Sequence, residues 1–107
     1  MDLPKLMQEL RTDEGKDNSV ISSGIQSALD ELNQQLSWFS GLSDGRQRAL
    51  VNMHFNMGWK QLSEEEDFLT AMETGDWRKA ARELERSQWG RSMGVRALRL
   101  LQLVVGG

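Results

Sequence analysis

A carboxylate at the end of a predicted helix is the group in this sequence best placed to do chemistry. Glu14 is followed by a glycine, and a side chain at such a helix end can face a cleft. Cleavage of glycosidic bonds uses two carboxyl groups, one as general acid and one as base or nucleophile. The other carboxylates nearby belong to Asp13, Asp17, Asp30 and Glu31. The first question is therefore whether one of them can act together with Glu14.

Asp17 is the candidate for this second carboxylate, because it follows Glu14 by three residues in a segment rich in turn formers. In an inverting hydrolase the two carboxyl groups lie roughly 6.5–9.5 Å apart, with a water between them. A flexible loop could bring Asp17 to that distance. Such a loop would hold the water poorly, however, because catalysis depends on preorganised geometry.

The sequence offers few residues for other kinds of catalysis. It contains no cysteine, which excludes disulfides and thiolate metal sites. His54 is its single histidine, so a site with several histidines cannot form within one chain. We therefore expect no metal and no other cofactor, and we interpret His54 as a histidine of the core or of a groove.

Charge is distributed unevenly along the chain, whose formal net charge is −3. Residues 1–75 carry 13 acidic and 6 basic side chains, whereas residues 76–107 carry 3 acidic and 7 basic ones. A basic C-terminal third could meet an anionic polymer such as cell wall, nucleic acid or lipid, or it could be a solvated helical face. Because acids are interleaved with these basic residues, we expect no nucleic-acid partner.

The sequence shows no sign of a membrane span or a leader. No uncharged run approaches the roughly 18 residues that a membrane span needs. The first residues, Met1-Asp2-Leu3-Pro4, lack the basic-then-apolar order of a signal peptide. We therefore expect a protein that is made and kept in the cytoplasm unless another factor releases it.

Apolar residues recur at helical spacing along the chain, and no segment alternates as a strand does. We expect a single all-α domain over residues 1–107, an orthogonal bundle of about six helices. The first helix should begin near Pro4, and residues 15–24 are typical of a loop of turn-forming residues. Residues 46–57 are apolar on most sides, which predicts a central buried helix.

The rest of the predicted bundle follows from the same spacing. Residues 88–92 are expected to turn, and residues 93–105 are expected to form a last helix. The expected core comprises Leu6, Leu10, Leu32, Leu50, Met53, Phe68, Trp77, Leu84, Trp89, Ala97 and Leu101.

Several segments, taken in order, resemble one known family. Leu10-Arg11-Thr12-Asp13-Glu14-Gly15 resembles the helix-ending motif of the T-even-type phage lysozymes, which are peptidoglycan-cleaving endolysins. Residues 49–58 look like that family's central helix. Four further segments resemble the C-terminal helices of that family: Gly75-Asp76-Trp77, Ala80-Ala81, Ser87-Gln88-Trp89 and Val95-Arg96-Ala97. The resemblance covers residues 3–15 and 44–103 and implies the helical lobe of such a lysozyme.

The same resemblance implies roles for individual residues. Glu14 would be the general acid, and Arg96 would hold its carboxylate. Phe55 and Asn56 would line the floor of the cleft where the glycan binds. Asn52 would satisfy buried backbone groups rather than touch the substrate.

One element of the family pattern is missing. The family places its second carboxylate nine residues after the acid, in an Asp-x5-Thr arrangement on a small β lobe; here those positions hold Ser23 and Leu29. The roughly ten residues expected between the first two helices cannot build three strands of usual length. The β lobe is therefore predicted to be absent.

These departures favour a muramidase homologue that acts on peptidoglycan glycan strands with reduced or no hydrolysis, made in the host cytoplasm and reaching the cell wall if released. One alternative is an active enzyme with a rearranged site. Another is a helical binding or scaffolding module that reuses the fold. The cleft edge left by the missing lobe should be apolar and could favour a homo-oligomer.

Overall fold

The computed structural model describes all residues from 1 to 107 and contains helices but no strand. The α-helices are α1 (Leu3–Glu14), α2 (Asn18–Gln35), α3 (Asp44–Ser63), α4 (Glu66–Thr74), α5 (Trp77–Arg86), α6 (Gln88–Met93) and α7 (Val95–Gly106), with a 3₁₀ turn at Phe39–Gly41. The predicted all-α class is confirmed. The turn expected at residues 88–92 was wrong, because Ser87 caps a short helix there by accepting the amide of Gly90 at 2.9 Å.

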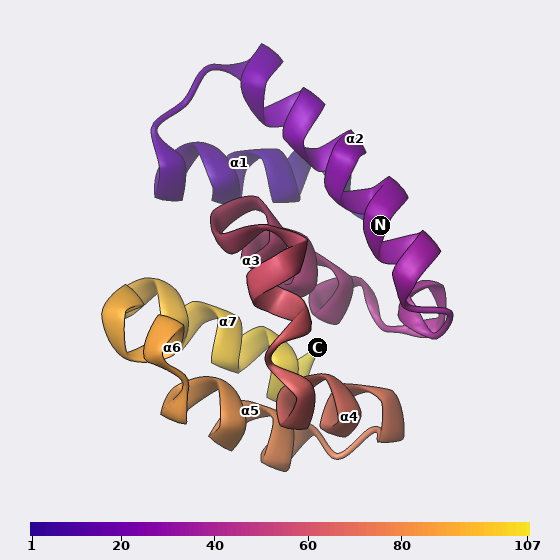
Figure 1. Ribbon diagram of the computed structural model, residues 1–107. Coiled ribbons are helices and arrows are strands. Elements are labelled where there is room, and N and C mark those ends of the chain that lie inside the picture. Colours follow the sequence, from indigo (N-terminus) through magenta and orange to yellow (C-terminus); the bar gives the residue numbers. More distant parts are fainter.

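Helix α3 lies in the middle of the molecule, with α1 and α2 on one side and α4 to α7 on the other (Figure 1). It packs against both α2 and α7, while α5 packs against α4 and α7. A cluster of 21 buried hydrophobic residues takes members from every α-helix, so the two sides share one core. None of the helices combines the length and the apolar character needed to cross a membrane.

The connection between α1 and α2 is shorter than expected. It spans residues 15–17 rather than 15–24, because α2 already begins at Asn18. Asp17 accounts for this early start, since its side chain accepts the backbone amide of Val20 at 3.0 Å and caps the helix. Ile21 is fully buried, so the segment gains apolar contacts as a helix that it would lack as a loop.

Helix α3 carries the predicted central helix in its first part. Ser43 caps it, and its buried residues include Leu50, Val51 and Met53 on several sides. At Gly58 the backbone leaves the helical region, with φ 77° and ψ 168°, and helical structure then resumes as far as Ser63. This positive φ suits a glycine. The predicted helix over residues 46–57 ends at this kink, whereas the helical residues that continue to Ser63 were not predicted.

A buried arginine fixes the start of α1 on α3. Arg48 is 5% exposed, and its Nη1 donates to Glu9 Oε2 at 2.6 Å while its Nε donates to Asp44 Oδ2 at 2.8 Å. The backbone amide of Asp2 donates to the other oxygen of Asp44, at 2.6 Å. These contacts attach α1 to the beginning of α3 at Asp2 and at Glu9. They therefore restrict where Glu14, the last residue of α1, can lie.

Nine of the eleven expected core residues are buried, and Trp77 and Leu101 are only partly so. The indole of Trp77 lies beneath the guanidinium of Arg46, whose Cζ is 3.7 Å from the ring centroid. The same guanidinium donates to the carbonyls of Val104 and Val105 near the end of α7. Trp77 therefore stacks on a cation at the edge of the bundle instead of entering its centre.

Candidate active site

Three helices meet at Glu14, the last residue of α1. Arg96, near the start of α7, donates from Nη2 to Glu14 Oε1 at 2.7 Å. The same nitrogen donates to Asn56 Oδ1 on α3 at 3.2 Å. The side chain of Glu14 is 15% exposed, and its other oxygen, Oε2, has no protein partner. One oxygen is thus held while the other is free to meet a ligand.

Asp13 forms a second ion pair beside the first. Arg99, one turn after Arg96 on α7, donates from Nη2 to Asp13 Oδ1 at 2.7 Å and from Nη1 to Oδ2 at 3.0 Å. This is a bidentate arrangement, which fixes orientation as well as adding attraction. The Asp13 side chain is only 4% exposed, so both of its oxygens are used inside the protein.

Asn52 links the two pairs. Its Nδ2 donates to Asp13 Oδ2 at 3.2 Å, and its Oδ1 accepts from Asn56 Nδ2 at 3.2 Å. A continuous chain of contacts therefore runs from Arg99 through Asp13, Asn52, Asn56 and Arg96 to Glu14. Asn52 was expected to satisfy buried backbone groups. It is 3% exposed and instead connects the side chains of Asp13 and Asn56.

Phe55 and Asn56, both expected at the cleft floor, lie in different surroundings. Asn56 belongs to the chain of contacts at Glu14, whereas Phe55 packs against α2 at Gly24. A Cβ at Gly24 would lie 2.2 Å from Phe55 Cε2, so the ring depends on a glycine at that position. The ammonium group of Lys16 lies 5.8 Å from the centroid of the same ring.

The space beside Phe55 is a shallow hollow of about 240 Å³ between α2 and α3. Lys16, Val20, Ser27 and His54 are among its lining residues. His54 Nε2 lies 2.6 Å from Glu31 Oε1 on α2, which places this histidine in a groove as expected. No group of three or more His, Asp or Glu side chains is arranged to hold a metal ion.

Asp17 does not lie in a flexible loop but forms the N-cap of α2. Its Oδ1 accepts the amide of Val20 at 3.0 Å and the hydroxyl of Ser19 at 2.8 Å. The amide of Val20, and then the hydroxyl of Ser19, lower the pKa of this carboxyl below its usual range. The expectation of a mobile carboxylate was wrong, because the group is committed to the start of its own helix.

The pairing of Asp13 with Arg99 was missed from the sequence, although a signal for it exists. Asp13 and Glu14 are neighbours at the end of α1, and Arg96 and Arg99 are three residues apart on α7. That spacing places both arginines on one helix face, so two adjacent acids can meet two successive arginines.

An acid at the end of the first helix is held by an arginine of the last helix, as the family resemblance implies, and that arginine also donates to an asparagine of the central helix. The family model described as phage lysozyme matches residues 5–102, and the chain belongs to this family. The resemblance inferred from the sequence is thus confirmed at the level of the family.

The chain is also similar to part of a larger curated protein. The chain is 35% identical over 69 residues to the pre-baseplate central spike protein Gp5 of Enterobacteria phage T4. That stretch is 64% of this chain but only 12% of the spike protein. No solved structure gives a significant match.

Proposed function

We propose that this domain binds peptidoglycan glycan strands and hydrolyses them slowly or not at all. One observation supports this most directly: Glu14 is held by Arg96, while every other carboxylate between residues 13 and 31 already has a protein partner. These partners are Arg99 for Asp13, the first turn of α2 for Asp17, Gln26 for Asp30 and His54 for Glu31.

The chemical consequence is an acid without a co-catalyst. Glu14 can give a proton to a leaving oxygen through its free Oε2. Cleavage also needs a carboxylate that activates water or attacks the sugar, and the position where the family carries it holds Ser23 in this chain. General acid catalysis alone contributes roughly 10²–10⁴-fold, far below the rate enhancements of roughly 10⁶-fold or more that enzymes reach.

The short connection between α1 and α2 adds to this effect. Three residues, 15–17, stand where the family has a lobe opposite the acid. A site without a second wall excludes water poorly, which weakens each electrostatic contact within it. Glycan contact would then depend on the groups at Glu14, mainly Arg96 and Asn56, whose side chains are partly exposed.

Binding is tested by sedimentation of the protein with purified peptidoglycan sacculi. We expect the wild type to pellet with sacculi and Asn56→Ala to bind several-fold more weakly, because it loosens Arg96. Asp30→Asn, an exposed substitution on α2, serves as the control and should bind like the wild type. Failure of the wild type to pellet would contradict the proposed binding.

Hydrolysis is tested separately, by the release of reducing sugar ends from the same sacculi. Wild type, Glu14→Gln and Asp17→Asn should all stay near the background rate. The third variant is informative because Asn caps helices as well as Asp does and only the carboxylate is lost. A wild-type rate clearly above both variants would instead support an active muramidase with a rearranged site.

A structural role within a larger phage protein is the second candidate function. It is favoured by the similarity to part of a spike protein. Self-association through the cleft edge belongs to this reading, since Val20 beside the hollow is 46% exposed. Sedimentation velocity of wild type and Val20→Glu tests it, and a wild type that stays monomeric at all concentrations would exclude self-association there.

A further inference from the structure

Only one carboxylate oxygen in the chain of contacts at Glu14 has no protein partner. Glu14 Oε1 accepts from Arg96 at 2.7 Å, whereas Oε2 accepts from no protein group. Both oxygens of the neighbouring Asp13 accept from Arg99, at 2.7 and 3.0 Å. Proton transfer between these acids and a ligand therefore passes through Oε2 of Glu14.

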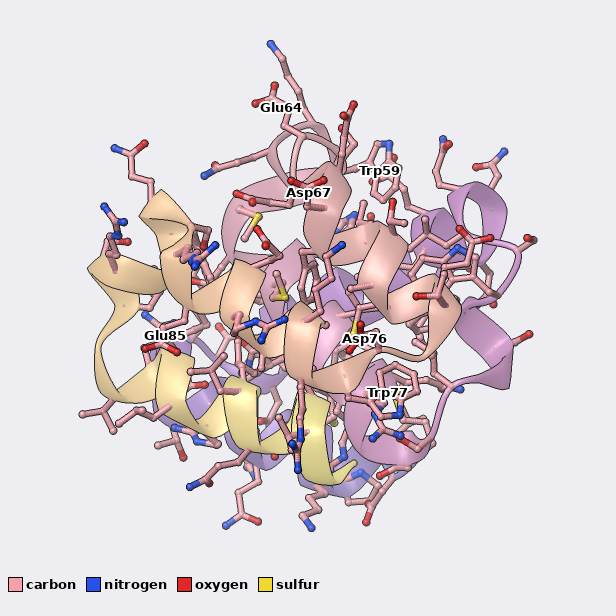
Figure 2. All side chains as sticks on the ribbon, turned by 90° about the horizontal axis from the view of Figure 1, so that it is seen from below. Trp59, Glu64, Asp67, Asp76, Trp77 and Glu85 are labelled. Atoms are coloured by element: carbon pink, nitrogen blue, oxygen red, sulfur yellow. The ribbon has the colours of Figure 1, made fainter.

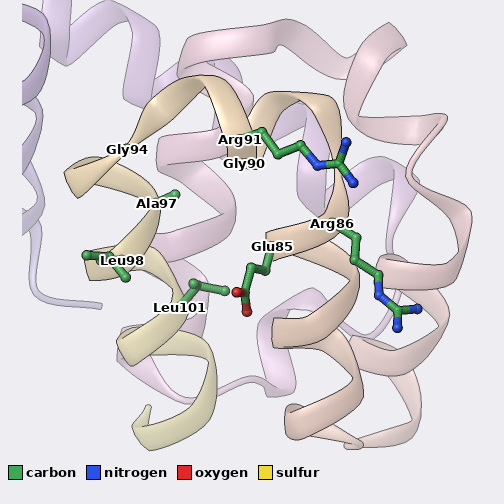
Figure 3. A pocket seen from close by; sticks show the side chains of 8 residues that line it. All are labelled: Glu85, Arg86, Gly90, Arg91, Gly94, Ala97, Leu98 and Leu101. Atoms are coloured by element: carbon green, nitrogen blue, oxygen red, sulfur yellow. The ribbon is translucent and has the colours of Figure 1, made fainter.

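Acids of α4 and α5 lie elsewhere in the molecule. Glu85 lines a hollow of about 440 Å³ between α5, α6 and α7, whose lining residues include neither Glu14 nor Arg96 (Figure 3). Glu64 and Asp67 lie at one edge of the molecule, where α3 ends and α4 begins (Figure 2). The groups at Glu14 come from α1, α3 and α7 instead. The site therefore has one acid, and the second reacting group must come from another source.

The substrate itself can supply that second group. In substrate-assisted cleavage, the 2-acetamido oxygen of a sugar attacks C1 in place of an enzyme carboxylate. The amino sugars of peptidoglycan bear this acetamido group, and their 6-hydroxyl lies on the same face of the ring as the departing oxygen. A well-oriented internal nucleophile has an effective concentration of roughly 10⁵–10⁸ M, so it needs no second wall to hold water in place.

We propose that Glu14 cleaves the glycan without water, by closing the 6-hydroxyl of one sugar onto its own C1. First the acetamido oxygen bonds to C1 from the α face, the C1–O4 bond breaks, and Glu14 Oε2 gives its proton to O4. Then O6 bonds to C1 from the β face, the acetamido oxygen leaves C1, and the O6 proton returns to Oε2. The products are a 1,6-anhydro sugar and a free 4-hydroxyl. This inference rests on the glycan binding proposed above.

The position of Glu14 suits both proton transfers. The departing O4 and the attacking O6 lie on the same face of the sugar, so one group on that face serves first as acid and then as base. Arg96 holds Oε1 in both steps and leaves Oε2 as the atom that meets the ligand. The same nitrogen of Arg96 donates to Asn56 at 3.2 Å, which fixes the guanidinium and through it the acid.

No enzyme group is needed on the opposite face of the sugar. An inverting hydrolase activates its water from that face with a second carboxylate. This chain has Ser23 at the family position of that carboxylate and only residues 15–17 between α1 and α2. The elements that are missing are thus those that hydrolysis requires and closure onto C1 does not.

This reaction leaves no trace in an assay for reducing ends. Closure of O6 onto C1 removes the free anomeric hydroxyl, so a cut produces no new reducing sugar. A protein that stays at the background rate in that assay can therefore still shorten the glycan.

The proposal is tested by mass spectrometry of fragments released from purified peptidoglycan sacculi in water enriched in heavy oxygen. The wild type should release fragments that lack the heavy isotope and are lighter by one water molecule than hydrolysed fragments of the same composition. Their amount should exceed that in sacculi alone. Glu14→Gln should lower this release about a hundredfold or more, since general acid–base catalysis contributes roughly 10²–10⁴-fold. Asp30→Asn, which removes an exposed carboxylate of α2, is the control and should match the wild type.

Sedimentation with sacculi separates the ways in which the proposal can fail. If the wild type pellets with sacculi but releases no lighter fragments, the reaction is wrong and the glycan binding stands. Heavy-oxygen fragments that depend on Glu14 would show hydrolysis instead. Equal release by wild type and Glu14→Gln, with both folded by circular dichroism, would exclude Glu14 as the acid. If the wild type neither pellets nor releases lighter fragments, the binding and the reaction both fail.

Discussion

Two neighbouring acids at the end of α1 are bound to two arginines of α7, and the two pairs differ in how completely the protein uses them. Asp13 is 4% exposed and accepts two contacts from Arg99 and one from Asn52. Glu14 is 15% exposed and accepts a single contact from Arg96. Both oxygens of Asp13 accept hydrogen bonds within the protein, whereas Glu14 has one oxygen without a protein partner.

We infer from this difference that the Asp13 pair has a structural role and the Glu14 pair a role in ligand binding. The Asp13 pair joins α1 to α7 and, through Asn52, to α3, so it fixes the place where α1 ends. The Glu14 pair is positioned by that junction and contributes less to it. We therefore expect substitutions at Asp13 to change stability and substitutions at Glu14 to change ligand binding.

The largest effect is predicted for Asp13→Asn. The amide would put a donor where Asp13 accepts from Arg99 and Asn52, and it would leave the Arg99 charge without its anion. The expected loss is about 2–3 kcal/mol of unfolding free energy, below the usual cost of breaking a buried pair because Arg99 is 33% exposed. Urea denaturation measures it. A loss no larger than that of Glu14→Gln would contradict the division of tasks.

Asn52→Ala should have the next largest effect. It removes the link between the two pairs and leaves the half-buried amide of Asn56 with one partner fewer. We expect a loss of about 1–2 kcal/mol, typical of a broken buried hydrogen bond. A double-mutant cycle with Asp13→Asn should be non-additive because the two residues are in contact. Additive losses would indicate that Asn52 does not couple to Asp13.

Part of this site could be predicted from the sequence and part could not. The resemblance placed Arg96 with Glu14 because both lie in segments that match the family. The bidentate pair with Asp13 was not predicted, because Arg99 entered the sequence analysis only as one of the basic side chains of residues 76–107. Its spacing from Arg96 carried the signal, but only the packing of α7 on α3 and α1 decides which face of α7 is turned inward.

The connection between the first two helices shows a different limit. Residues 18–24 are rich in serine and include a glycine, which locally favour turns. The cap by Asp17 and the burial of Ile21 outweigh that preference. Gly24, which was interpreted as a turn former, instead allows Phe55 to pack closely against α2. Such tertiary contacts cannot be derived from local propensity.

Glu14→Gln should change stability little, by about 0.5 kcal/mol, since a glutamine oxygen can still accept the single contact from Arg96. It is the matched counterpart of Asp13→Asn, because each replaces a carboxylate by its amide on the same helix. The main effect should be on binding to sacculi. The substitution puts an amide nitrogen or an uncharged oxygen in the place of Oε2, the oxygen of Glu14 that has no protein partner. If Glu14→Gln were as destabilising as Asp13→Asn, both pairs would be structural.

Asp17→Asn should have the smallest effect, and that effect should depend on pH. The amide of Val20 and the hydroxyl of Ser19 hold the pKa of Asp17 below its unfolded value, so the ionised group stabilises the folded state at pH values above the unfolded pKa. That contribution is lost as the pH falls through the folded pKa. Asparagine keeps the cap but has no charge to interact with the helix dipole. In thermal unfolding followed by circular dichroism, the wild type should therefore be slightly more stable than Asp17→Asn at neutral pH, and the two should converge in acid. A difference that stays constant down to a pH of about 2 would mean that the carboxylate charge of Asp17 does not stabilise α2 and that the cap acts through hydrogen bonding alone.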